Sequence, residues 1–152
     1  MKRLVLAKSR SLILNPLEGH AESVRCIKDP NLRGTIKELA QLDGAFVVSA
    51  TGVVVAACRY LDAAASPVDV PLGLGSRHIA AAHISSATRA IGIVVSESSV
   101  VRLFCHGGLI GEIIPELWMT KRYDFQAGGR LVKETVGDLA VITPRPRWGS
   151  PK

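Results

Sequence analysis

Between residues 35 and 114 the chain alternates short apolar segments with polar or glycine-containing turns. AFVVSA (45–50) and VVVAAC (53–58) are rich in β-branched residues and flank Thr51-Gly52, which predicts a β-hairpin. AIGIVV (90–95) is a continuous apolar run, and such a run is typical of a strand buried on both faces. Segments of this kind predict a β-sheet in the middle of the chain.

Two helices and two further strands are expected around these segments. TIKELAQL (35–42) has the apolar spacing of a short amphipathic helix, and residues 77–88 form an alanine-rich helix. VVRLFC (100–105) and LIGEII (109–114) read as strands joined by a glycine turn. The sequence therefore predicts one α/β domain, over residues 35–143, in which helices flank a mixed central sheet.

The two ends of the chain have weaker patterns. Residues 4–14 fit an edge strand or a hairpin, and residues 15–31 have room for one helix, within an N-terminal segment (1–34) that has no firm assignment. GDLAVIT (137–143) predicts a last strand, and residues 144–152 predict a loose basic tail. The abrupt start and the indistinct first 30 residues are typical of a domain taken from a longer protein.

Length and composition indicate a globular protein. The 152 residues fit one domain, and a hydrophobic content of 47% is enough for a core. No apolar run reaches the roughly 18 residues that a membrane span needs, and charges interrupt the N-terminus too often for a secretion signal. The three cysteines form no CxxC pair. We therefore expect a reduced, cytoplasmic protein without a membrane segment.

The formal net charge of +6 comes from the ends of the chain. Residues 1–10 and 144–152 contain no acid and carry these basic residues: Lys2, Arg3, Lys8, Arg10, Arg145, Arg147 and Lys152. Without them, 12 basic residues stand against 13 acidic ones. The excess predicts solvated tails, with a functional basic arm as the alternative. Only 5% of the residues are aromatic, which argues against nucleic acid as a partner.

The stretch LGLGSRHIAAAH (72–83) places Arg77 and His78 at the start of the alanine-rich helix, a few residues after two glycines. A helix start offers free backbone N–H groups and the positive end of a dipole, which suit a phosphate. The glycines let the backbone approach a bulky anion, and the guanidinium of Arg77 matches phosphate oxygens. The stretch has the make-up of a polyphosphate cradle. The alternative is a helix cap with a surface arginine and a packed histidine.

Two further motifs lie beside predicted strands. Asp43-Gly44 occupies a helix-to-strand junction, where a carboxylate can reach a metal or a hydroxyl; a simple Asp-Gly turn is the alternative. Ser96-Glu97-Ser98 follows the strand at 90–95, and ligands collect at the carboxyl ends of strands in α/β folds. A polar turn between two strands would look the same. No motif among the three names a reaction by itself.

Taken in order, these motifs resemble the diadenylate cyclase domain, which is also found at the N-terminus of the DNA-integrity-scanning proteins. Members of that family have the motif DGA at the start of a strand, followed by an apolar hairpin. The motif G-T-R-H-R-A-A then begins a helix, and I-V-V-S-E stands at the end of a later strand. Here the corresponding stretches are DGAFVVSATGVVVAACRYL (43–61), GSRHIAAA (75–82) and AIGIVVSES (90–98). The resemblance covers about residues 35–115 well and the ends poorly. Its order and spacing make it specific.

The resemblance implies a nucleotidyltransferase that condenses two ATP into cyclic di-AMP (c-di-AMP). In such domains each protomer binds one ATP, and two protomers face each other in a homodimer or in a larger assembly of such dimers. Each 3′-hydroxyl attacks the α-phosphate of the other ATP, and two pyrophosphates leave. Mg²⁺ or Mn²⁺ offsets the charge that accumulates on the phosphates.

The resemblance also implies roles for individual residues. The catalytic residues would be Asp43, Arg77 and His78, with Asp43 at the reacting hydroxyl and Asp43 and Glu97 at the metal. The ATP-binding residues would be Gly44 and Ala45 at the ribose, Gly75, Ser76, Arg77 and His78 at the triphosphate, Ser96 and Glu97 on its other side, and Leu61 with Tyr60 at the adenine.

Three positions depart from the family pattern. Ile79 replaces the second arginine of R-H-R, Ser98 replaces a second acid, and Ser76 replaces threonine while keeping the hydroxyl. The first two substitutions support an alternative function, a sensor module that binds ATP or c-di-AMP without turnover. A third reading, nucleic-acid binding through the basic ends, predicts an affinity that weakens steeply with salt. The retention of Asp43, Arg77 and His78 together favours the active cyclase.

Overall fold

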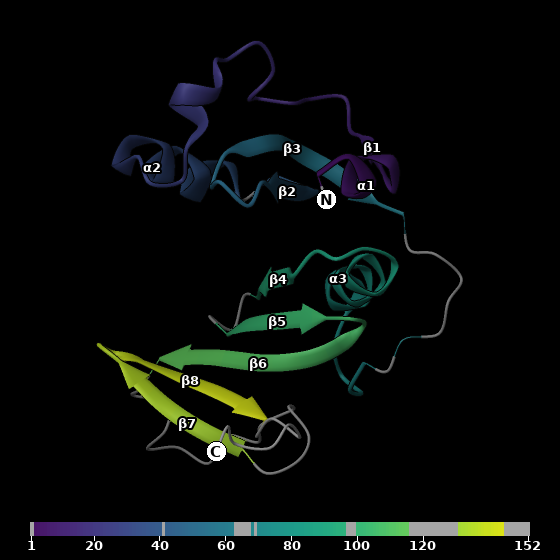
Figure 1. The fold of residues 1–152 in the computed structure, drawn as a ribbon, viewed down its shortest axis with the longest axis vertical. Coiled ribbons are helices and arrows are strands. Elements are labelled where there is room, and N and C mark those ends of the chain that lie inside the picture. Colours follow the sequence, from purple (N-terminus) through teal and green to yellow (C-terminus); the bar gives the residue numbers. More distant parts are fainter. Residues whose placement is uncertain are drawn as a thin grey trace, which may run out of the picture. The chain divides into compact units, whose positions relative to one another are not determined.

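The computed structural model describes residues 2–40, 42–62, 68, 70–96, 100–115 and 131–144. The chain forms two compact units, Met1–Ala63 and Ala64–Lys152. Figure 1 shows the elements of each unit, and each unit is described by itself below. In the part of the chain that is described, no helix is long and apolar enough to cross a membrane.

The first unit is built around a three-stranded antiparallel sheet with the order β1-β3-β2. Its elements are α1 (Lys2–Ala7), β1 (Ser9–Ser11), the 3-10 helix η1 (Glu22–Arg25), α2 (Pro30–Leu39), β2 (Ala45–Val48) and β3 (Val54–Leu61). The predicted hairpin is therefore present as β2 and β3. The core of the unit consists of five buried residues: Leu17, Leu32, Val54, Ala57 and Cys58.

Helix α2 begins five residues before the predicted start. The Asp29 side chain caps it by accepting a hydrogen bond from the Asn31 N–H (2.8 Å), and Pro30 occupies the first turn. An acidic cap followed by proline is a strong start signal, because proline has no N–H to leave unpaired there. The apolar spacing used for the prediction covers only the second half of the helix.

The N-terminal residues do not form the solvated tail that was predicted. Arg59 on β3 holds them, because its guanidinium donates to the Leu6 carbonyl (3.1 Å) and the Ser9 hydroxyl (3.1 Å), and it also bonds Ser11. The predicted edge strand is present only as β1, and a helix precedes it. The predicted C-terminal tail was residues 144–152; Pro144 is the last residue of β8 (Leu139–Pro144), and residues 145–152 lie outside the described residues.

Among its described residues, the second unit forms a five-stranded antiparallel sheet with one helix packed on it (Figure 1). Its elements are α3 (Ser76–Ala87), β4 (Gly92–Val95), β5 (Val101–Cys105), β6 (Gly108–Pro115), β7 (Leu131–Val136) and β8 (Leu139–Pro144), and the strand order is β4-β5-β6-β8-β7. Helix α3 packs on β4, β5 and β6. One buried cluster joins the helix to the sheet, with Ala81 and Ala82 from α3 and Val94 and Phe104 from the strands.

The α/β fold class is confirmed, and the sheets differ from the expectation in two ways. The described strands pair antiparallel in two sheets instead of one mixed sheet. Most of the pairs join consecutive strands with short connections, which favour antiparallel pairing. The prediction that the strand at 90–95 is buried on both faces was wrong. Val94 faces α3 and is 6% exposed, whereas Ile93 and Val95 are 64% and 66% exposed, because α3 covers only one face of this edge strand.

The close approach of α3 to β4 depends on Gly92. A Cβ at this position would lie 2.8 Å from the Ala81 carbonyl oxygen and 3.0 Å from the Ala81 Cβ. We expect Gly92→Ala to lower the free energy of unfolding by about 1–3 kcal/mol, because the helix must move away from the strand. Urea denaturation measures this change. Gly108→Ala is a suitable control, since its nearest neighbour would be 3.8 Å away.

Candidate functional site

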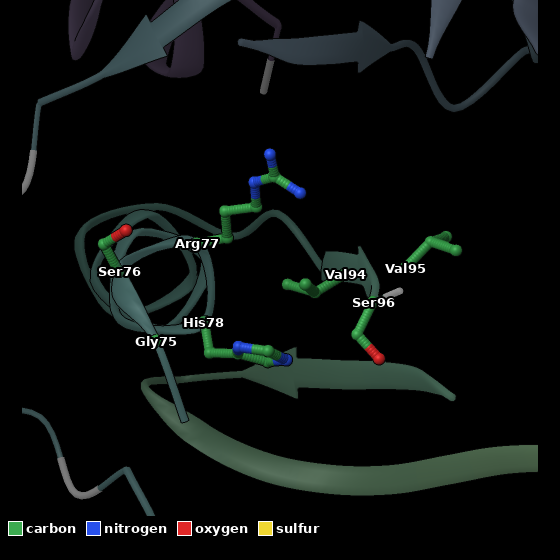
Figure 2. A pocket seen from close by; sticks show the side chains of 7 residues that line it. All are labelled: Gly75, Ser76, Arg77, His78, Val94, Val95 and Ser96. Carbon is green, nitrogen blue, oxygen red and sulfur yellow. The ribbon is translucent and has the colours of Figure 1, made fainter. Parts of the chain in front are cut away.

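A pocket of about 430 Å³ lies in the second unit between the start of α3 and the end of β4 (Figure 2). It is lined by Gly75, Ser76, Arg77, His78, Val94, Val95 and Ser96. Its volume lies within the range of small-molecule sites, roughly 300–1,000 Å³. The pocket therefore gathers the predicted phosphate-binding residues of the G-S-R-H stretch together with the predicted Ser96.

The first turn of α3 opens this pocket without a side-chain cap. Gly75 is the N-cap residue, and no described side chain bonds to the first N–H groups of the helix. The helix has 12 residues and carries no acid in its first turn. Uncapped N–H groups at the positive end of a helix attract an anion. Figure 2 shows Arg77 and His78 leaving the helix in different directions.

His78 is the most unusual side chain of the pocket. It is 8% exposed, and neither ring nitrogen has a hydrogen-bond partner among the described residues. Its ring packs edge-on against Phe104 of β5, with 6.2 Å between the ring centroids. Burial and the positive charge of Arg102 lower the pKa of His78, and they outweigh the opposite effect of the Gly75 backbone. A buried imidazole without a partner is expected to bind a polar group of a ligand.

The lowered pKa of His78 predicts that acid destabilises the fold. The unfolded chain takes up a proton near the ordinary histidine pKa of 6.5, whereas folded His78 resists protonation. Stability is therefore unaffected well above that pH and falls as the pH drops through 6.5 toward the lowered pKa. We expect the free energy of unfolding, measured with urea, to fall more between pH 7.5 and pH 5.5 for the wild type than for His78→Asn. His106→Asn, in the exposed β5–β6 turn, is the matched control and should keep the wild-type loss.

Ser96 closes the far side of the pocket. Its hydroxyl and its N–H both bond the Val100 carbonyl oxygen, each at 3.1 Å. These bonds join the end of β4 to Val100, just before β5. The predicted metal ligand Glu97 and the variant position Ser98 lie outside the described residues. Ile79, which replaces the second arginine of the family motif, is 40% exposed and does not line the pocket.

Asp43 and Gly44 lie in the first unit, before β2. Asp43 is exposed, and its Oδ1 accepts a hydrogen bond from the Gly44 N–H at 2.9 Å. Gly44 has a φ of +97°, and a Cβ there would lie 2.7 Å from the Cys58 carbonyl carbon. The chain can make this approach only with glycine, because the neighbouring atoms are backbone. Ala45 begins the strand and pairs with Arg59.

Tyr60 and Leu61, the predicted adenine contacts, are successive residues at the end of β3. Successive residues of a strand point to opposite faces, so a base lying flat on one face contacts only one of them. Tyr60 is 47% exposed, and the Arg10 guanidinium lies 4.4 Å from its ring centroid. That cation–π contact occupies a face of the tyrosine ring.

Sequence reasoning missed two residues near the pocket, Arg102 and Glu112. They are buried and form an ion pair on the sheet face that α3 covers. Each is a lone charge within an otherwise apolar strand sequence, VVRLFC or LIGEII, and this was the signal that the sequence offered.

The comparisons with known proteins agree with these motifs. The model of the family described as DisA bacterial checkpoint controller nucleotide-binding matches residues 4–109. The chain is 47% identical over 112 residues to a diadenylate cyclase of Methanocaldococcus jannaschii, an alignment that covers 73% of this chain and 35% of that protein. It is 46% identical over 115 residues to a diadenylate cyclase of Haloferax volcanii, with coverages of 75% and 42%.

The extent of the matched regions differs from the full length of the relatives and from the extent of the motifs. The alignments reach only 35% and 42% of the two curated relatives, and no solved structure matches the chain. The family match begins at residue 4, so the similarity extends further toward the N-terminus than the motifs predicted. It covers well over half of the chain and contains all three motifs. The chain therefore belongs to the DisA-type nucleotide-binding family, the diadenylate cyclase domain family.

Proposed function

We propose that the chain catalyses the condensation of two ATP molecules into c-di-AMP, with release of two pyrophosphates. Membership of the diadenylate cyclase family and the names of the two relatives support this reaction. The structural observation that carries the proposal is the pocket at the start of α3. There His78 is buried with no hydrogen-bond partner among the described residues, beside N–H groups that no capping side chain covers. These are the features of a site for a polyphosphate.

In this proposal the pocket binds the triphosphate of ATP. Ser76 and the first N–H groups of α3 donate to phosphate oxygens, and the exposed Arg77 neutralises their charge. His78 donates from one ring nitrogen. Loss of pyrophosphate concentrates negative charge on the leaving oxygen, so donors held in place before the reaction favour the transition state.

Asp43 is assigned to the attacking 3′-hydroxyl. Its carboxylate is exposed, and the turn that holds it is fixed because Gly44 lies against the β3 backbone. A carboxylate held at this point can orient the hydroxyl and accept its proton as the oxygen bonds to the α-phosphorus. Each of the two new bonds joins the 3′-oxygen of one ATP to the α-phosphorus of the other. In this proposal each protomer binds one ATP, so the reaction requires a second protomer. We therefore propose a homodimer as the active form.

A divalent cation, Mg²⁺ or Mn²⁺, fits the residues assigned to it. No group of three metal-binding side chains gathers among the described residues, and Asp43 is an exposed carboxylate. Mg²⁺ is usually held by one or two carboxylates together with substrate phosphates, so such a site need not exist before ATP binds. Asp43 and Glu97 would hold the ion, which supplies positive charge to the phosphates when bound.

The test is synthesis of c-di-AMP from ATP with Mg²⁺ or Mn²⁺, followed by chromatography with mass detection. We expect product from the wild type and at least about a hundredfold less from Asp43→Asn, the usual loss when a positioned proton acceptor is removed. Asp62→Asn, which neutralises another exposed acid of the same unit, should keep wild-type activity.

Other results would change the assignment. If no product forms with either metal while ATP or c-di-AMP still binds, the chain is a sensor module, and Ile79 and Ser98 become the residues to revert. If the protein neither binds nucleotide nor forms product, the proposed function is refuted. Retained activity in Asp43→Asn would remove Asp43 from the mechanism.

A further inference from the structure

The Arg102–Glu112 ion pair is buried on the sheet face that α3 packs against, and Arg102 lies opposite Val94, which lines the pocket. The two residues are direct partners across β5 and β6, and Arg102 Nε lies 2.9 Å from Glu112 Oε1. Their side chains are 7% and 0% exposed. The same face of the sheet includes three of the most deeply buried side chains, Phe104, Ile114 and Ile142, and Lys133 of β7 lies on this face as the partner of Ile142.

Stability alone is a poor explanation for charges in this place. Two ions removed from water lose hydration, and apolar residues of similar volume often serve as well or better in a core. The pair therefore calls for a role that an apolar pair could not fill. Its position suggests that role, because Val94, the β4 partner of Arg102, lines the pocket.

Arg102 is the charged residue that acts on His78. The imidazole packs on Phe104, two residues from Arg102 on β5, and the positive charge of Arg102 disfavours protonation of the ring. Among the described residues, the charged groups around His78 are Arg77 on its own helix, Arg102 on β5 and Glu112 on β6, and β4 contributes none. The positive member of the pair thus lies on the pocket side and the negative member one strand further away.

We propose that Arg102, held by Glu112, is a positioning residue of the nucleotide site. It places a fixed positive charge behind the pocket floor, which attracts the triphosphate, and it keeps the His78 imidazole uncharged, with one nitrogen donating and the other accepting. This inference rests on the proposed function, because the triphosphate of ATP is the anion concerned.

Two variants with opposite expected effects test the proposal. Arg102→Met/Glu112→Leu removes the pair without changing net charge and replaces it with apolar side chains. Glu112→Gln keeps the arginine and removes only the negative charge. The probe is an ATP analogue with a methylene group between the α- and β-phosphates, which cannot release pyrophosphate, and its affinity is measured by titration calorimetry.

We expect the double variant to bind the analogue about fivefold more weakly and Glu112→Gln to bind it as tightly as the wild type or more tightly. A fivefold change in affinity is small for the loss of one positive charge close to the triphosphate in an effective dielectric of about 20. The second readout is the NMR titration of His78, which is simple to assign because the chain has four histidines. The pH midpoint of the His78 titration should rise in the double variant and fall in Glu112→Gln.

The outcomes separate this inference from the proposed function. If the wild type binds the analogue and a folded double variant binds it equally, with an unchanged His78 titration, the ion pair is only structural and the inference is wrong. If the double variant does not fold, weaker binding by Glu112→Gln overturns the inference. If the wild type does not bind the analogue, the proposed function fails, and the inference fails with it.

Discussion

Arg102→Met alone is expected to lower the free energy of unfolding by about 3–5 kcal/mol. The substitution leaves the Glu112 carboxylate, which is 0% exposed, buried without its guanidinium. Removal of one member of a buried ion pair is far less favourable than replacement of both members by apolar residues. Guanidinium chloride is unsuitable for this measurement because it screens charges, so urea denaturation at constant ionic strength is the method of choice.

The controls for this prediction use the same substitution elsewhere and the double variant. Arg89→Met removes an exposed arginine just after α3 and should change stability by less than about 0.5 kcal/mol. Arg102→Met/Glu112→Leu should recover most of the loss, because the remaining charge is gone. A single variant as stable as Arg89→Met would mean that Glu112 does not depend on Arg102.

Gly44→Ala is expected to lower the free energy of unfolding by about 2–4 kcal/mol and to abolish c-di-AMP synthesis. The new Cβ would lie 2.7 Å from the Cys58 carbonyl carbon and 2.9 Å from the Arg59 nitrogen. Neither backbone atom can rotate away as a flexible side chain would, and the φ of +97° disfavours alanine. The turn must therefore shift, and Asp43 shifts with it.

Thermal unfolding and the c-di-AMP assay measure the two effects of this substitution. Gly34→Ala in the exposed part of α2 is the matched control, because a Cβ there meets nothing within 4 Å. It should stabilise the protein by about 0.5–1 kcal/mol, since alanine favours a helix more than glycine does. Gly44→Ala with wild-type stability and full activity would show that the turn is not fixed as described.

The sequence predicted the elements whose signals are local. The β2–β3 hairpin has β-branched runs around a Thr-Gly turn, and α3 has an alanine-rich core. The helix was therefore expected within one residue of its observed bounds and the hairpin strands within three. The pocket residues from Gly75 to His78 were also predicted, because they are adjacent in the chain and the helix start brings their polar groups together.

The features that were missed depend on partners distant in sequence. The N-terminal residues are ordered by Arg59, about 50 residues away, and no pattern in the first ten residues signals that contact. The ion pair joins two strands whose register follows from the turn between them. The one-sided burial of β4 depends on how much of the strand α3 covers. Strand β7 was not predicted, since its residues alternate weakly and are mostly exposed.

The Arg59 contacts also determine which strand of the first unit is sheltered. Because β1 pairs along one side of β3 and β2 along the other, β3 has neighbours on both sides. A version of the protein that began after Ser11 would turn β3 into an edge strand, with free N–H and C=O groups beside Tyr60 and Leu61. Such edges recruit other chains, and the pairing of β1 with β3 covers this one.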